Sequence, residues 1–319
     1  MQATLKSTQV EEAPTKGLDN TSRSGRKGLD ELVPSRYAQR VGDIDVLVVS
    51  DGVLSPPAES MATNADPSVR GTWLDNMFLA RDVFDWALNA VVVRSGGQTI
   101  LIDSGIGLEY PDFPRAGQLV HRLEAAGIDL GSVTDVVLTH MHFDHVGGLL
   151  LAGVKERLRP DLRIHLAEAE VKFWGAPDFS RTAMPPDLVE VARSASRRFL
   201  AEYRGKLQPF GEESEVAPGV VVHRTGGHTP GHSVVRLASG ADKLIFAGDA
   251  LFPVSFDHPE WHNGFEHDPE EAFRVRVRLL HELAESGSSL MATHMPFPSL
   301  GRVALNGEVF RWVPAIWDY

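Results

Sequence analysis

Four potential metal-binding side chains lie close together in Thr139-His140-Met141-His142-Phe143-Asp144-His145. His140 and His142 are two residues apart, so their side chains point the same way in extended backbone. Asp144 and His145 follow as the chain turns, and they can face a second position beside the first. Neutral imidazoles and carboxylates are ligands that zinc and neighbouring first-row metals prefer. This segment therefore predicts a metal site.

Three further donors follow later in the chain, each at the end of a predicted strand. They are His228, in Gly227-His228-Thr229-Pro230-Gly231-His232, followed by Asp249 and His294. Strand ends beside glycines are places where a rigid scaffold presents ligands to a cleft. We therefore expect these donors to join the first four at one site.

The remaining histidines are expected to have other roles. His232 is interpreted as fixing the loop around His228 rather than binding metal. Three more lie in an aromatic, acidic loop after Asp249, which either borders a substrate entrance or lies at the surface: His258, His262 and His267. The others are expected at the surface or as satisfied polar residues: His121, His165, His223 and His281.

Composition limits the classes of function. The chain has 319 residues, a formal net charge of −12 and no cysteine. Disulfides and cysteine-ligated zinc are excluded. The negative charge argues against nucleic acid as a partner, because phosphate binding needs clustered Lys and Arg. The most apolar stretch, Val146–Val154, is too short to span a membrane, and the N-terminus lacks an apolar secretion segment, so a cytoplasmic location is expected.

The elements that position these donors can be read from the hydrophobic pattern. Residues 1–35 are polar and aperiodic, and we expect a flexible tail there, followed by one folded domain over residues 36–319. Short apolar runs predict strands over Asp45–Ser50, Ala90–Arg94, Thr99–Asp103, Asp135–Thr139, Val220–Arg224, Val234–Leu237, Leu244–Ala247 and Leu290–Thr293.

Helical spacing of apolar residues predicts four helices. The clearest, Pro269–Glu285, has Asp268 as its N-cap and Gly287 after its end. The other three are Arg115–Ala126, Leu166–Trp174 and Asp187–Tyr203. An α/β architecture of two mixed sheets covered by helices, an αββα sandwich, fits this order of elements.

The HxHxDH motif followed by His, Asp and His resembles the metallo-β-lactamase-fold hydrolase superfamily over roughly residues 45–319. The resemblance implies two divalent metal ions, most simply zinc, with manganese, iron or cobalt as alternatives. It also implies that one ion takes His140, His142 and His228, that the other takes Asp144, His145 and His294, and that Asp249 bridges them. Asp103 resembles the carboxylate that orients a ligand histidine in this family.

Within the superfamily, short C-terminal segments resemble the methyl parathion hydrolase and lactonase branch. They are Thr293–Pro298, Gly301 and Arg311–Pro314. Lactamases that ligate zinc through cysteine are excluded, and the 25 residues after His294 are too few for the helical domain of glyoxalase II. The resemblance implies a small-molecule substrate, an ester or lactone, with organophosphate triesters as a further class.

The mechanism implied by the resemblance uses a hydroxide that bridges the two metals and attacks a carbonyl carbon or phosphorus. Asp144 is the candidate catalytic residue that steers this hydroxide and passes a proton. The pocket is expected to be largely apolar. Its candidate residues are Phe113, Phe173, Trp174, Met184 and Phe252. Tyr110 and Tyr203 are the two mid-chain tyrosines that could hold a substrate carbonyl, as in some lactonase relatives, but neither lies in a matching motif.

Two alternatives stay open at this level. The same site could serve a lactamase-like or thioester hydrolase, and a substrate panel separates these readings. A metal-dependent protein that binds a ligand without turnover is the other alternative, although the complete donor set and Asp144 argue against it. The sequence leaves a homodimer open.

Overall fold

The computed structural model describes residues 33–107 and 113–317. Most of the predicted tail, residues 1–32, and Tyr110 lie outside these ranges. Contacts divide the chain after Pro34, and the architecture below is that of the unit Ser35–Tyr319.

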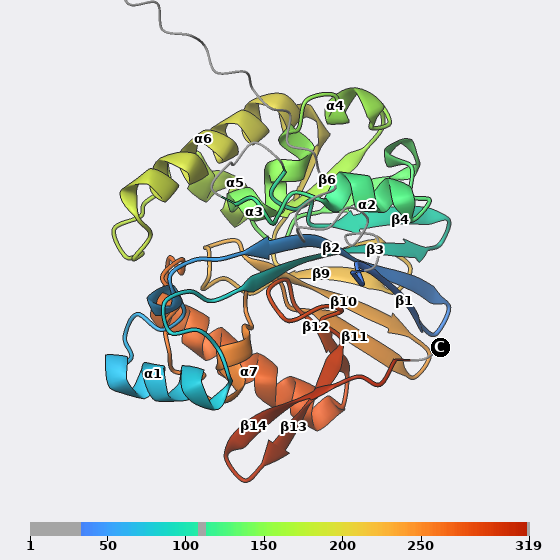
Figure 1. Ribbon diagram of the computed structural model, residues 1–319. Coiled ribbons are helices and arrows are strands. Elements are labelled where there is room, and N and C mark those ends of the chain that lie inside the picture. The colour runs from blue at the N-terminus through green and yellow to red at the C-terminus, as the bar shows by residue number, and fades with distance from the viewer. Residues whose placement is uncertain (1–32, 108–112, 318–319) are drawn as a thin grey trace, which may run out of the picture. The chain divides into compact units, whose positions relative to one another are not determined.

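Seven strands form a first sheet in the spatial order β1 to β7, which is also their chain order (Figure 1). The pairs from β1 to β4 are antiparallel, and the pairs from β4 to β7 are parallel. The strands are β1 (Arg36–Val41), β2 (Ile44–Leu54), β3 (Trp86–Ser95), β4 (Gln98–Ile102), β5 (Asp135–Val137), β6 (Arg163–Ala167) and β7 (Leu207–Phe210).

A second sheet of seven strands packs on the first, with β14 and β8 at its edges. Its only parallel pair within the described ranges is β11 with β12, so the chain must cross over between them. Its strands are β8 (Glu213–Ala217), β9 (Val220–Arg224), β10 (Ser233–Ser239), β11 (Asp242–Phe246), β12 (Ser289–Met291), β13 (Gly301–Asn306) and β14 (Val309–Pro314).

Alternate residues of the central strands face two different apolar layers. In β2, Val46 and Val48 pack between the sheets, whereas Val49 packs under the helices of the first sheet. In β10, Val235 faces the first sheet and Val234 faces away from it. Because both faces are covered, these strands contain consecutive apolar residues, as in Val46–Val49 and Val234–Val235.

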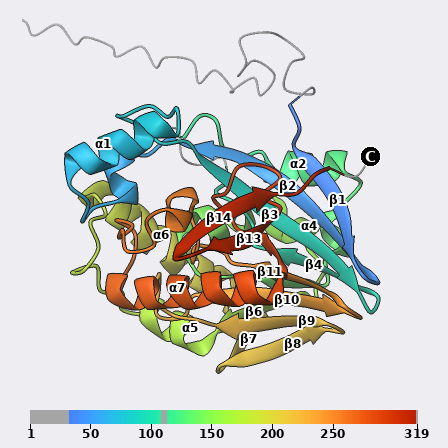
Figure 2. The same cartoon turned by 90° about the horizontal axis from the view of Figure 1, so that it is seen from below.

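Helices cover the outer face of each sheet. Leu119 and Phe199 belong to the apolar layer over the first sheet, and Leu279 and Leu283 belong to the layer over the second. Figure 2 shows α7 running across the second sheet beside β13 and β14. The helices are α1 (Pro67–Asn76), α2 (Leu119–Ala125), α3 (Phe143–Val146), α4 (Val154–Arg157), α5 (Glu168–Trp174), α6 (Pro186–Tyr203) and α7 (Pro269–Ser286).

The layers form the αββα sandwich that the sequence predicts. Helix α7 has the predicted caps: the Asp268 side chain accepts a hydrogen bond from Glu271 N at 3.1 Å, and Gly287 has a φ of 62°. Within the described ranges, no helix combines the length and apolar character that crossing a bilayer requires.

Two predicted helices begin later than their periodicity suggests. The helix expected from Leu166 begins at Glu168, because Arg163–Ala167 pairs with strands on both sides as β6. The helix expected from Arg115 begins at Leu119, and the Arg115 carbonyl accepts a hydrogen bond from Val53 N at 3.0 Å instead. The hydrophobic pattern does not predict α1 or the β13–β14 hairpin, because neither has a strong apolar period.

Candidate metal centre

The predicted donors come from segments that follow four strands of the sandwich. His140 and His142 lie after β5, and α3 carries the next two donors. His228 lies between β9 and β10, and Asp249 follows β11. His294 follows β12. The sheets thus bring together residues that are up to 154 positions apart in the chain.

Three imidazoles form the first group of donors. His142 Nδ1 lies 3.0 Å from His140 Nε2 and 3.0 Å from His228 Nε2. All three residues are buried. A single proton can form a hydrogen bond between only two of these three nitrogens. The close approach of all three therefore leaves nitrogen lone pairs directed at a common point.

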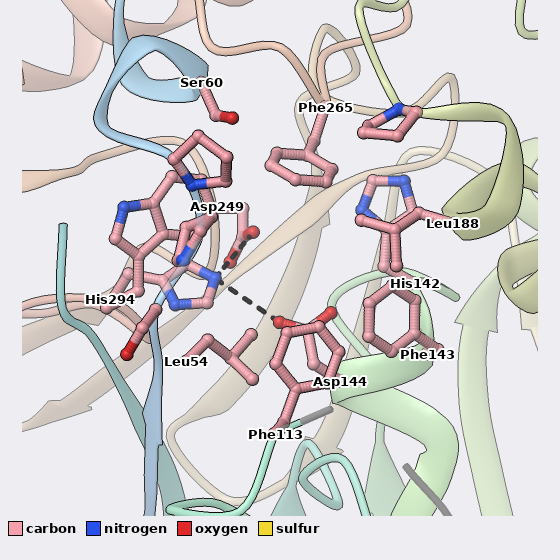
Figure 3. A pocket seen from close by; sticks show the side chains of 15 residues that line it. Leu54, Ser60, Phe113, His142, Phe143, Asp144, Leu188, Asp249, Phe265 and His294 are labelled. Carbon is pink, nitrogen blue, oxygen red and sulfur yellow. Dashed lines mark hydrogen bonds and ion pairs between the residues drawn. The ribbon is translucent and has the colours of Figure 1, made fainter. Parts of the chain in front are cut away.

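The second group combines a carboxylate with two imidazoles. Asp144 Oδ2 lies 3.6 Å from both His145 Nε2 and His294 Nε2. One ligand atom from each residue falls within 4.8 Å of the others. Asp144 and His294 also line the pocket described below (Figure 3).

Asp249 lies between the two groups and contacts both. Its Oδ2 is 3.4 Å from His228 Nε2 and 3.1 Å from His294 Nε2. Its Oδ1 is 3.3 Å from His145 Nε2. The carboxylate is therefore placed to share its oxygens between two neighbouring positions.

The donor set fits divalent cations. His145 Nε2 and Asp249 Oδ1 are buried and have no hydrogen-bond partner within the described residues. Buried polar atoms are nearly always paired, so such atoms at the centre of a histidine cluster indicate a ligand role. Imidazole and carboxylate donors in this number suit zinc and its first-row neighbours.

Electrostatics differ between the two groups. Burial lowers the pKa of His140, His142 and His228 well below the usual histidine value, so these rings are neutral. Burial also opposes charge on His145, but neighbouring carboxylates, Asp249 first among them, raise its pKa well above the usual value. The first group is therefore a set of neutral imidazoles, whereas the carboxylates of Asp144 and Asp249 lie directly beside the imidazoles of the second group.

Asp103, which the family resemblance suggests as the carboxylate that orients a ligand histidine, contacts a donor of the second group. Its Oδ2 lies 2.8 Å from His145 Nδ1, and its Oδ1 accepts a hydrogen bond from Thr139 N at 2.8 Å. Protonation of Nδ1 leaves His145 Nε2 free to bind a cation. Asp103 has a left-handed φ of 58°, a conformation that aspartate adopts more readily than most residues.

Strand β3 holds the loop that carries His294. His294 Nδ1 donates to the Ala87 carbonyl at 2.9 Å. The Asn89 amide donates to the carbonyls on either side, Thr293 at 2.9 Å and Met295 at 2.7 Å. These contacts direct His294 Nε2 to the centre, and sequence analysis did not identify Asn89 because nothing local marks it.

Glu170 joins the two loops that carry the first group of donors. This buried carboxylate accepts hydrogen bonds from Met141 N at 2.9 Å, Thr229 Oγ1 at 2.7 Å and Gly231 N at 2.9 Å. Trp174 Nε1 donates to it as well, at 2.7 Å. Met141 lies between two histidine donors, so Glu170 fixes their loop to the loop of the third.

His232 has the structural role that the sequence predicts. Its Nε2 accepts a hydrogen bond from Asp249 N at 3.1 Å, so its Nδ1 carries the proton and donates to Thr225 Oγ1 at 2.8 Å. Burial lowers its pKa to about 4. His232 thus holds the backbone of Asp249 from behind the centre.

Close packing explains the glycines after the HxHxDH motif. A Cβ atom on Gly148 would lie 1.9 Å from the Ser104 carbonyl oxygen, and one on Gly147 would lie 2.0 Å from that of Ile106. The φ of Gly147 is −63°, which any residue can adopt. Glycine is therefore required because the backbone after Asp103, at Ser104 and Ile106, packs directly against these two positions.

An apolar pocket opens onto the centre (Figure 3). Asp144, Asp249 and His294 contribute its polar floor, together with His142. Aromatic and aliphatic side chains surround them: Leu54, Pro56, Pro57, Trp86, Phe113, Phe143, Pro185, Leu188 and Phe265. Trp86 packs against the His294 ring, with 5.0 Å between ring centroids.

Of the predicted pocket residues, only Phe113 lines this pocket within the described chain. Phe252 is buried and stacks on His294 at 5.3 Å between centroids. Trp174 is buried against His142 and donates to Glu170. Phe173 and Met184 belong to the apolar layer of the first sheet. None of these four lines the pocket, and Trp174, Met184 and Phe252 are buried in the apolar layer of the first sheet.

Tyr203 does not reach the centre. Its ring is fully buried in α6, and its hydroxyl donates to the Leu149 carbonyl at 2.7 Å. No described tyrosine lines the pocket, so a tyrosine that holds a substrate carbonyl is not found among the described residues.

The fold and the donor cluster together point to one known superfamily. The model of the metallo-beta-lactamase superfamily matches residues 84–285, and the chain belongs to this superfamily. The match begins just before β3 and ends in α7, so it contains six of the seven donors.

Curated relatives match about half of the chain. A probable metallo-hydrolase of Mycobacterium tuberculosis is 26% identical over an alignment of 192 residues. The alignment covers 51% of this chain and 56% of the relative. A hydroxyacylglutathione hydrolase of Bradyrhizobium is 30% identical over 149 residues, 45% of this chain and 42% of the relative. The chain thus spans about half the length of these curated relatives.

A solved structure matches much more of the chain. AidC, a dizinc quorum-quenching lactonase, superimposes with a TM-score of 0.82 at 26% identity. The superposition covers 89% of this chain and 99% of that chain.

Proposed function

We propose that the protein is a binuclear metal-dependent hydrolase of uncharged lactones and esters, with organophosphate triesters as a further class. The position of Asp249 carries the proposal, because this carboxylate contacts both donor groups at the floor of an apolar pocket. In the proposed assignment, His140, His142 and His228 hold one cation, and Asp144, His145 and His294 hold the other. Zinc is the simplest choice of metal.

The pocket lining supports an uncharged substrate. Among the described residues that line it, none is Lys or Arg. An anionic thioester would therefore leave its charges without a cationic partner at the wall, and burying such charges is costly. A neutral acyl or aryl group instead finds Phe113, Leu188 and Phe265.

In the proposed reaction, the bound cations and the side chains of the protein have different roles. When bound, two divalent cations supply a water that is acidic enough to react near neutral pH and an electrophile for the substrate oxygen. Asp144 lines the pocket and is 8% exposed, so its free carboxylate oxygen can receive a proton from the attacking water. It then passes that proton to the leaving alkoxide or phenoxide as the bond from carbon to the leaving oxygen breaks.

A substrate panel tests the proposal. We expect chelator-sensitive turnover of an aryl ester and a lactone, with kcat/KM for a thioester of the same acyl group well below both. A methyl phosphotriester in the same panel measures the further class, and a lactam measures the lactamase-like alternative. Dominant thioester or lactam turnover would replace the proposal with the alternative hydrolase. Absence of turnover with two metals bound would indicate a ligand-binding role.

The pocket wall predicts a dependence on substrate size. Phe265→Ala removes apolar surface from the wall, so KM for an ester with a long acyl chain should rise about tenfold, with kcat nearly unchanged. The measurement compares long-chain and acetyl esters, and the acetyl ester should change little. Phe78→Ala, at a side chain that is 98% exposed, provides the matched control. Equal effects on both esters would contradict an acyl group at this wall.

A further inference from the structure

His267 is a buried imidazole directly behind the first donor group. It lies two residues before α7, is 7% exposed, and its backbone N–H donates to the His228 carbonyl at 2.8 Å. Its Nε2 lies 3.3 Å from His142 Nε2. The sequence predicts that the loop containing His267 borders a substrate entrance or lies at the surface. That prediction is wrong for His267, because the loop folds inward and brings its ring against His142.

The position of the proton on His267 follows from its other contact. Its Nδ1 lies 3.0 Å from the Asp178 carbonyl oxygen, which can only accept a hydrogen bond. Nδ1 therefore carries the proton. The rings of Phe173 and Phe179 lie 4.8 and 5.0 Å away between centroids, and a charged ring in these surroundings would be costly. The neutral ring then has its lone pair on Nε2.

We propose that His267 positions His142 as a metal ligand by accepting a hydrogen bond from His142 Nε2. With its proton held on Nε2, His142 has its lone pair on Nδ1. This is the atom that lies 3.0 Å from the ligand nitrogens of both His140 and His228. The inference rests on the proposed role of His142 as a metal ligand. It adds that His267 determines which nitrogen of His142 carries the proton.

This partner differs from those of His145 and His294. His145 donates its outer proton to the Asp103 carboxylate, and His294 donates to a backbone carbonyl. Carboxylates, carbonyls and water are the usual partners of metal-binding histidines, and losing such a partner lowers metal affinity about 10–100-fold. Without His267, the His142 N–H would be buried and unpaired, and the other tautomer would compete.

The test measures zinc affinity rather than activity. Metal-free wild type and variants are titrated with Zn²⁺ against a chromophoric chelator, which resolves two dissociation constants. His267→Phe keeps an aromatic ring in its aromatic surroundings but removes the acceptor, and one Kd should rise about 10–100-fold while the other changes little. His267→Gln offers an amide oxygen to His142 and an amide N–H to the Asp178 carbonyl, so it should restore tight binding of both ions.

The outcomes separate this inference from the proposed function. His262→Phe, at a partly exposed histidine of the same loop, is the matched control and should bind zinc as wild type does. If His267→Phe fails to fold, His267→Leu takes its place in the comparison with His267→Gln. Wild-type zinc affinity in His267→Phe would overturn the positioning role but not the binuclear centre. An equal loss of zinc affinity in His267→Phe and His267→Gln would do the same. Fewer than two zinc sites in wild type would overturn the proposed binuclear centre and this inference with it.

Discussion

Asp249→Asn is expected to lower kcat/KM about 10³-fold or more and to leave the purified protein with fewer than two bound metal ions. The carboxylate contacts imidazoles of both donor groups, at 3.1 to 3.4 Å. Asparagine keeps its size but removes the negative charge and one acceptor oxygen. Metal ions contribute several kcal/mol of transition-state stabilisation, which corresponds to this loss in rate. The measurement combines metal analysis with kcat/KM on the best substrate of the panel.

The control for this variant is Asp187→Asn, which removes the same charge from an exposed position in the first turn of α6. It should retain both metals and the full rate. Two tightly bound ions and wild-type kcat/KM in Asp249→Asn would show that the carboxylate is not shared between the sites. Loss of rate with both ions retained would instead place Asp249 in the chemistry rather than in metal binding.

Glu170→Met is expected to lower the free energy of unfolding by about 3 kcal/mol or more. The substitution leaves four donors without their acceptor, at Met141, Thr229, Gly231 and Trp174. Each buried donor that loses its partner costs about 1–3 kcal/mol, and relaxation recovers part of the sum. A domain of this size loses roughly 2–4 °C of Tm per kcal/mol, so Tm should fall by about 6–12 °C.

Thermal unfolding with and without chelator measures this effect. Glu168→Met changes the same residue type on the same helix at an exposed position, so it should leave Tm nearly unchanged. Glu170→Gln keeps one acceptor oxygen and should lie between the two. An unchanged Tm in Glu170→Met would mean that the His140 and His228 loops hold their places without this carboxylate.

Chain sequence was sufficient to identify the donors that the structure brings together. The HxHxDH spacing and the strand-end positions of His228, Asp249 and His294 are local features, and each depends only on backbone period and residue chemistry. The same local signals predicted most central strands and the helix α7. They succeeded because both sheet faces are covered, which gives these strands runs of consecutive apolar residues.

Tertiary structure alone decided how the donors are held and what surrounds them. Glu170, Asn89 and His267 lie in unremarkable local sequence, and the donor loops that they contact are at least 29 positions away along the chain. The aromatic residues of the pocket show the same limit: Phe113 reaches it, whereas Trp174 is buried behind the centre. A hydrophobic pattern tells which residues are buried, but the partner of a buried polar group is set by long-range packing, which a single sequence does not encode locally.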